Sequence, residues 1–138
     1  MRQMPLVLQL PRHLQDSVWA HVLRELPREG VGVLGAGPGG GDTVVLRAVY
    51  PLRNIAASPE HRYLADPLQL LRALRVMRED GLVLGAIYHS HPQGPARPSQ
   101  TDLRLAEYRV PYLIADVARR ELRAYLLPEN VEVELALV

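Results

Sequence analysis

The chain has 138 residues, of which 48% are apolar and 22% charged, and its formal net charge is +1. This length and balance fit one globular domain with a single core, spanning residues 1–138. The absence of cysteine excludes disulfides, thiolate nucleophiles and every Cys-containing metal site, so any metal has to be held by His and carboxylate groups.

The charge pattern and the apolar runs exclude two classes of partner. Basic residues are scattered along the chain rather than clustered, which argues against nucleic acid. No uninterrupted apolar run approaches the ~18–20 residues needed to cross a bilayer, and the first residues lack the features of a signal peptide. We therefore expect a cytoplasmic protein with no membrane partner.

The first half of the chain predicts a strand, a helix and a hairpin. Residues 6–10 form a short apolar strand, and Pro11 opens a helix that ends near Pro27, with an apolar face at one-turn spacing formed by Leu14, Val18 and Val22. Residues 31–34 and 43–50 read as two strands around a glycine-rich loop, which is typical of a hairpin.

An irregular stretch, residues 51–60, separates this hairpin from a second helix. After a short extended piece at 61–64, Asp66 as N-cap and Pro67 at the first helical position predict a helix start, and the helix continues to about Arg78.

The second half predicts one central strand, one helix and three terminal strands. The apolar run 82–88 is typical of a buried strand and leads directly into His89-Ser90-His91. A helix follows from Ser99 to about Tyr108, and strands are predicted at 111–117, 121–127 and 131–137. This order predicts an α/β (α+β) domain in two or three layers, with a mixed β-sheet flanked by helices.

Two histidines and one aspartate form the candidate metal site. His89 and His91 alternate with Ser90 at a strand end, so both imidazoles point to the same face. Asp102 follows in the first turn of the next helix. Two His and one carboxylate are a typical ligand set for catalytic zinc, which lowers the pKa of its bound water from ~15.7 towards ~7. We therefore predict one zinc ion per chain, held by His89, His91 and Asp102.

Such a site also needs a base and a donor for the developing oxyanion. Ser99, three residues before Asp102, is the candidate donor. Glu29, just before the strand at 31–34, is the candidate base, and the carboxylates that compete with it are Glu25, Glu60 and Glu79. In the loop 92–98, Arg97 is either a substrate contact or a solvated surface residue.

Each of these residues also has a purely structural interpretation. Either histidine alone is more often a polar residue at a strand end than a ligand. Ser99-x-x-Asp102 also matches a helix capping box, which explains both residues without a metal. The two interpretations overlap, because a cap would position the helix start that presents Asp102.

The complete pattern H-x-H-x(7)-S-x-x-D, from His89 to Asp102, resembles the JAMM motif of the MPN-plus metalloproteases. His-Ser-His-Pro at 89–92 agrees with that motif, as does Pro98-Ser99. Glu29 and the residues through Gly35 resemble the family's N-terminal glutamate segment, which favours Glu29 among the competing carboxylates. The resemblance covers about residues 5 to 127.

The resemblance implies a cytidine-deaminase-like JAMM/MPN fold and a zinc-dependent metallo(iso)peptidase. Its substrate would be an amide or isopeptide bond at the C-terminus of a ubiquitin-like or sulfur-carrier protein. Bacterial relatives often have Cys after the glutamate, where this chain has Gly30, and this difference bears on the identity of the substrate.

The alternative from another class is a non-catalytic MPN-type scaffold that binds a protein partner, although such relatives lack the metal ligands that this chain has. A zinc nucleoside deaminase is excluded, since its signature needs cysteine. The sequence leaves the oligomeric state open, a homodimer included.

Overall fold

The computed structural model describes residues 7–39 and 41–138. Over these residues seven strands and three helices follow one another in the order β1 (Val7–Leu10), α1 (Arg12–Glu25), β2 (Val31–Ala36), β3 (Thr43–Leu52), α2 (Pro67–Glu79), β4 (Val83–His91), α3 (Gln100–Leu105), β5 (Tyr112–Asp116), β6 (Glu121–Leu126) and β7 (Val131–Leu137).

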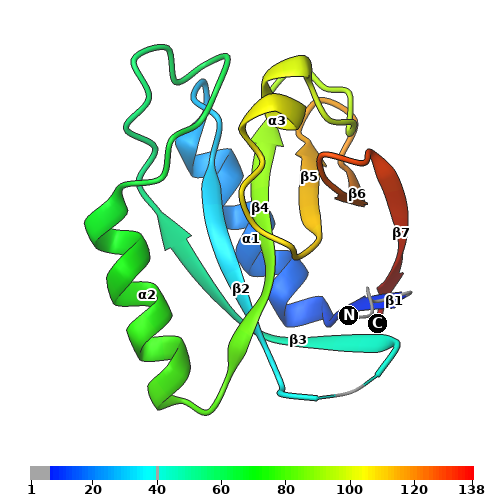
Figure 1. Ribbon diagram of the computed structural model, residues 1–138. Helices are drawn as coiled ribbons and strands as arrows, with labels where there is room; N and C mark the ends of the chain where they lie inside the picture. Colours follow the sequence, from blue (N-terminus) through cyan, green and yellow to red (C-terminus); the bar gives the residue numbers. More distant parts are fainter. Residues whose placement is uncertain (1–6, 40) are drawn as a thin grey trace.

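The strands form one ring in the order β1-β3-β2-β4-β5-β6-β7 (Figure 1). Two antiparallel pairs lie on each side of the parallel pair β4–β5, and β1 closes the ring by pairing parallel with both β3 and β7. The expected mixed sheet with flanking helices is therefore confirmed. Its closure was not predicted, because nothing in the local pattern says that the short β1 pairs with both β3 and β7, which are far from each other in the chain.

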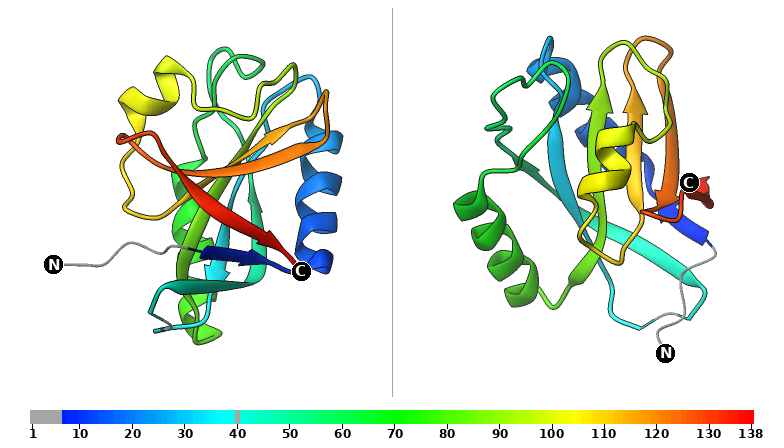
Figure 2. Two further views of the ribbon diagram at one scale, coloured as in Figure 1. Left: turned by 90° about the vertical axis from the view of Figure 1, so that its right-hand side faces the viewer. Right: turned by 45° about the horizontal axis from the view of Figure 1, so that its top comes forward.

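Helices α1 and α2 cover opposite faces of the strands β2 and β4 (Figure 2). Leu14 and Val18 of α1 pack in one core cluster with Tyr88, whereas Met77 of α2 packs in a second cluster with Ile87. Because successive side chains of a strand alternate between faces, β4 contributes to both clusters. Its buried apolar character follows from this double coverage.

Helix boundaries mostly agree with the sequence. The Asp66 carboxylate accepts hydrogen bonds from the N–H groups of Leu68 and Gln69, so it is the predicted N-cap of α2. The α3 helix ends at Leu105 rather than at about Tyr108. The reason lies in a later strand, where the hydroxyl of Tyr112 accepts the backbone N–H groups of residues 107 and 108 at 3.2 Å and diverts them from a helical pattern.

Strand boundaries differ mainly in length. Strand β4 continues through the His-Ser-His segment to His91 instead of ending at Tyr88. The strand predicted over 6–10 is β1, and Leu6 lies outside the described residues. Among the described helices, none is long and apolar enough to cross a membrane.

Candidate metal centre

Strand β4 delivers the two histidines to the site. It lies between β2 and β5 and pairs with both, so its backbone is held along both edges up to His91. His89 is fully buried and His91 is 8% exposed. Their ring centroids lie 5.0 Å apart, in agreement with the prediction that both side chains share one face.

Asp102 joins the two histidines from the first turn of α3. Its Oδ2 lies 3.1 Å from Nε2 of His89 and 3.1 Å from Nε2 of His91. The same oxygen accepts the backbone N–H of Ser99 at 2.8 Å, and Ser99 Oγ accepts the N–H of Asp102 at 3.0 Å. The capping box is therefore present, and it orients the carboxylate towards the imidazoles. The two interpretations of Ser99 and Asp102 are thus compatible.

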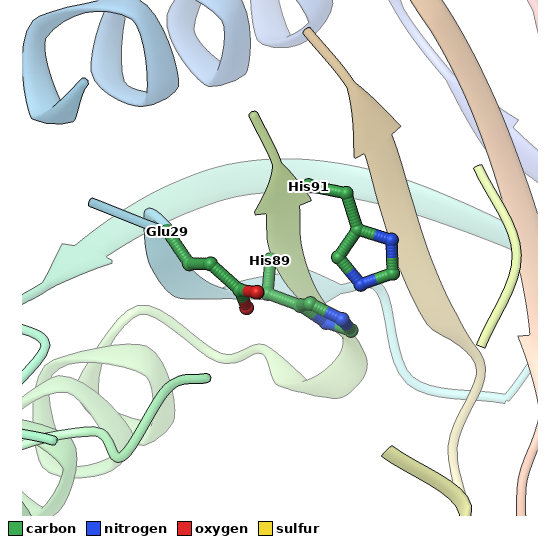
Figure 3. A group of neighbouring side chains, drawn as sticks. All are labelled: Glu29, His89 and His91. Carbon is green, nitrogen blue, oxygen red and sulfur yellow. The ribbon is translucent and has the colours of Figure 1, made fainter. Parts of the chain in front are cut away.

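Glu29 comes from the turn between α1 and β2 and is 5% exposed. Figure 3 shows its carboxylate pointing towards the imidazole of His89, with the ring of His91 beside it. In the described part of the chain, Glu29, His89 and His91 form a group whose possible ligand atoms all lie within 4.8 Å of one another. The competing carboxylates do not belong to this group: Glu25 pairs with Arg28 at 3.6 Å, Glu79 is exposed on α2, and Glu60 is exposed at the rim of the groove that Glu29 lines.

The pKa values of the two carboxyl groups of the site are shifted in opposite directions. Burial raises the pKa of Glu29 from 4.5 to about 7, which the nearby His91 only partly offsets. Burial alone would raise the pKa of Asp102 too, but the hydrogen bonds with His89 and His91 outweigh it and hold the pKa of Asp102 well below its usual range. Near neutral pH, Asp102 is therefore ionised while Glu29 is able to exchange a proton.

The hydrogen bonds of His91 indicate which ring nitrogen carries the proton. Its Nδ1 lies 2.7 Å from the carbonyl oxygen of Pro95, which only accepts, so Nδ1 carries the hydrogen. In a neutral imidazole, Nε2 then directs a lone pair at the Asp102 oxygen. This contact is repulsive unless a proton or a cation lies between the two atoms.

Two further buried atoms of the site have no hydrogen-bond partner among the described residues: Glu29 Oε1 and His89 Nδ1. Buried polar atoms without a partner are rare, and each one requires an explanation. With nitrogen and oxygen as the only ligand types, the group fits a small divalent cation.

Several contacts at the site could not be inferred from the motif. The ring of Tyr63 stacks on His89 with centroids 4.4 Å apart and planes at 29°. The Ser90 hydroxyl, between the two histidines, accepts the N–H of Gly30 at 2.7 Å. Tyr63 belongs to an irregular loop without periodicity, so no sequence signal pointed to it.

Two cavities meet at this cluster. A groove of about 760 Å³ is lined by Glu29 and His91 together with Arg97, Ser99 and other residues of the 92–98 loop. On the other side, a pocket of about 250 Å³ is lined by Asp102, Tyr63 and mostly apolar side chains, which include Leu64, Leu70, Leu105 and Ile87. His91 thus faces a wide groove with several charged side chains, and Asp102 faces a smaller, mostly apolar pocket.

Comparison with known proteins assigns the chain to a family. Residues 11–128 match the family described as prokaryotic homologs of the JAB domain. A probable TtuB-protein conjugate cleaving protease of Thermus thermophilus is 50% identical over 96% of this chain and 84% of its own length. The CysO-cysteine peptidase of Mycobacterium tuberculosis is 36% identical over 93% of this chain and 88% of its own length.

Solved structures agree with this assignment. A solution structure of a Desulfitobacterium hafniense protein superimposes with a TM-score of 0.85 at 36% identity, covering 95% of this chain and 92% of its own. A JAB1/MPN domain protein from Archaeoglobus fulgidus shares the fold, with a TM-score of 0.57 at 20% identity over 94% of this chain and 98% of its own. With residues 11–128 matched and close relatives along nearly its whole length, the chain belongs to the prokaryotic JAB family, within the JAMM/MPN fold.

Proposed function

We propose that this protein is a zinc-dependent peptidase that cleaves an amide or isopeptide bond after the C-terminal tail of a ubiquitin-like or sulfur-carrier protein. The observation that carries the proposal is the buried cluster of Glu29, His89, His91 and Asp102 between the groove and the pocket. The names of its relatives, a TtuB-protein conjugate cleaving protease, CysO-cysteine peptidase and desampylase, support this substrate class.

His89, His91 and Asp102 would hold the zinc ion. Ligand atoms around a tetrahedral zinc with bonds of about 2.0–2.1 Å lie roughly 3.3 Å apart. The separation of 3.1 Å between Asp102 Oδ2 and each imidazole Nε2 is close to that value. Zinc held by these residues would make hydroxide available at neutral pH and would polarise the substrate carbonyl.

Glu29 is the general base and then the general acid of the proposed reaction. Burial raises the pKa of this carboxyl group in the metal-free protein. Next to the metal site, Glu29 would take a proton from the attacking water and return it to the leaving amine. Ser99 would stabilise the oxyanion. Its oxygen accepts the Asp102 N–H, which leaves the hydroxyl hydrogen free to be donated to the substrate.

The positions of the residues indicate which side of the scissile bond faces the groove and which side faces the pocket. Glu29 lines the groove, so the amine that it protonates leaves on that side, next to Arg97. The acyl side of the substrate then lies towards the pocket lined by Asp102 and Tyr63, where an aliphatic side chain of the tail would be buried. The wide groove accommodates a protein amine or a free amino acid.

We assign this activity to a single domain that spans residues 1–138 and acts in the cytoplasm. A protein-interaction scaffold needs no metal ligands, and a scaffold would gain nothing from burying two imidazoles beside two carboxylates. This arrangement favours the peptidase over the scaffold.

Zinc content is the first measurement, for the wild type and for His91→Ala. We expect about one zinc per wild-type chain and little in the variant. The second measurement is cleavage of a ubiquitin-like protein fused through its C-terminal glycine to a reporter, with and without a chelator. Wild type that binds no zinc after reconstitution would overturn the proposal and favour the scaffold.

A further inference from the structure

The loop between β3 and α2, residues 53–66, contains a buried asparagine that no step of the proposed reaction uses. Asn54 is 8% exposed, and its Nδ2 donates to the carbonyl oxygen of Glu29 at 2.9 Å. The N–H of Glu29 in turn donates to the carbonyl oxygen of Pro59 in the same loop at 2.7 Å. Since both backbone polar groups of Glu29 bond to this loop, the loop determines where its side chain starts.

The same amide holds the other end of the loop. Its Nδ2 also donates to the carbonyl oxygen of Arg62 at 3.1 Å, and its Oδ1 accepts the N–H of Leu64 at 3.0 Å. These residues flank Tyr63, whose ring stacks on His89. The Asn54 side chain therefore holds the backbone on both sides of Tyr63, the residue whose ring covers His89.

The network requires an amide at this position. Its Oδ1 also accepts the N–H of Ala56 at 3.0 Å, and its Nδ2 makes a third, longer contact of 3.4 Å with the carbonyl oxygen of Pro59, so every donor and acceptor of the asparagine side chain is used. An aspartate has no hydrogen for these carbonyl oxygens and would repel them. A shorter side chain would leave the buried Glu29 carbonyl and three part-buried backbone groups of the loop without this partner.

We propose that Asn54 is a positioning residue, which holds the Glu29 backbone and the Tyr63 ring in place around His89. Its effect on the reaction rate rests on the proposed function, whereas its effect on geometry does not. The competing explanation is that Asn54 only stabilises the loop, so the test has to separate position from stability.

The test compares Asn54→Ala and Asn54→Asp with Val133→Ala. Asn54→Asp keeps the side-chain volume and the acceptor oxygen. This variant takes the place of Asn54→Ala in the comparison if the alanine variant does not fold. Val133 is 5% exposed on β7, in the core cluster that α1 covers. Its truncation lowers stability by removing core packing far from the loop, so it is the matched control.

The first readout is NMR of the proteins with and without zinc. Stacking by Tyr63 shifts the His89 ring protons, and Tyr63→Leu defines the signal without stacking. We expect the Asn54 variants to move the His89 signals towards those of Tyr63→Leu and to speed hydrogen exchange of the Glu29 amide, which is not bonded to Asn54 itself. His89 signals and Glu29 exchange equal to those of Val133→Ala would overturn the proposal.

The second readout is the cleavage of the same fusion protein. We expect kcat to fall on the order of tenfold to a hundredfold in the Asn54 variants, with KM changed less than about threefold and zinc content unchanged. A kcat within about twofold of Val133→Ala would contradict the role in positioning Glu29. If the wild type cleaves nothing, the proposed function fails, and the NMR comparison alone decides the inference.

Discussion

The backbone N–H of Gly30 donates a 2.7 Å hydrogen bond to the hydroxyl of Ser90, and the N–H of Ser90 donates to the Gly30 carbonyl at 3.0 Å. This reciprocal pair joins the residue after Glu29 to the residue between the two histidines. The candidate base and the candidate ligands are therefore held in one rigid unit, although they come from distant parts of the chain.

Ser90→Ala should weaken this unit. The substitution leaves the buried N–H of Gly30 without a partner, which costs about 1–3 kcal/mol of stability. Urea unfolding measures this loss. The control is Ser17→Ala, whose hydroxyl bonds the carbonyl of His13 on an exposed face of α1; its effect should stay within about 0.5 kcal/mol. Equal stability of the two variants would contradict the role of the Gly30–Ser90 pair.

Glu29→Gln should abolish turnover and leave zinc in place. The amide keeps the size of the side chain but cannot exchange the proton, so kcat should fall by about 10²–10⁴-fold. Steady-state kinetics and metal analysis of one preparation measure both properties. Glu79→Gln, at an exposed position of α2 that lines neither the groove nor the pocket, is the control with near wild-type kcat. Full activity of Glu29→Gln would exclude Glu29 as the base.

The metal-free protein should lose stability as pH rises through neutrality. The pKa of Glu29 rises from 4.5 to about 7 on folding because the side chain is buried. The folded state therefore holds this proton more tightly, and the stabilisation is complete below pH 4.5 and lost as pH rises through about 7.

The difference in the free energy of unfolding between wild type and Glu29→Gln isolates this contribution. Between the two pH values it should change by up to about 3 kcal/mol in favour of the variant. Urea unfolding of both chelator-treated proteins across this range is the measurement. A pH-independent difference would mean that Glu29 is not buried without a partner in the metal-free state.

Gly94→Ala should weaken metal binding. Gly94 has a φ of +69°, and an added Cβ would lie 2.6 Å from Oδ2 of the buried Asp116. The substitution would displace the next residue, Pro95, whose carbonyl oxygen orients His91. Loss of such an orienting contact typically lowers metal affinity about 10–100-fold, which competition with a zinc chelator measures.

Gly39→Ala is the matched control for this substitution. Gly39 has a comparable φ of +79°, but nothing lies within 4 Å of the added Cβ, and Gly39 lines neither the groove nor the pocket. Its backbone strain should lower stability without changing zinc affinity. The same affinity in both variants would exclude the proposed displacement of Pro95.

Local chemistry made much of the fold predictable. Asp66 and Pro67 mark a helix start because a carboxylate satisfies the free N–H groups of the first turn, and the structure has this cap. The alternation of strand side chains predicted that His89 and His91 share a face, and the rings lie close together. Both inferences needed only neighbouring residues.

The rest depended on contacts between distant segments. The predicted end of α3 was wrong because the hydroxyl of Tyr112, on a later strand, accepts the N–H groups of residues 107 and 108. Asn54 looked like an ordinary loop residue, since its partners lie both in its own loop and at Glu29, which precedes another strand.

The sequence by itself determined the ligand types, their spacing and the caps, because these follow from the chemistry and periodicity of adjacent residues. Only the tertiary structure shows that the carboxylate of Glu29, which the family resemblance favoured, lies beside the histidines. Glu29 resembles any other acidic residue at the end of a helix until β2 pairs with β4 and the loop 53–66 covers it. Burial then raises the pKa of Glu29 to about 7 in the metal-free protein, and burial is a property of the whole fold.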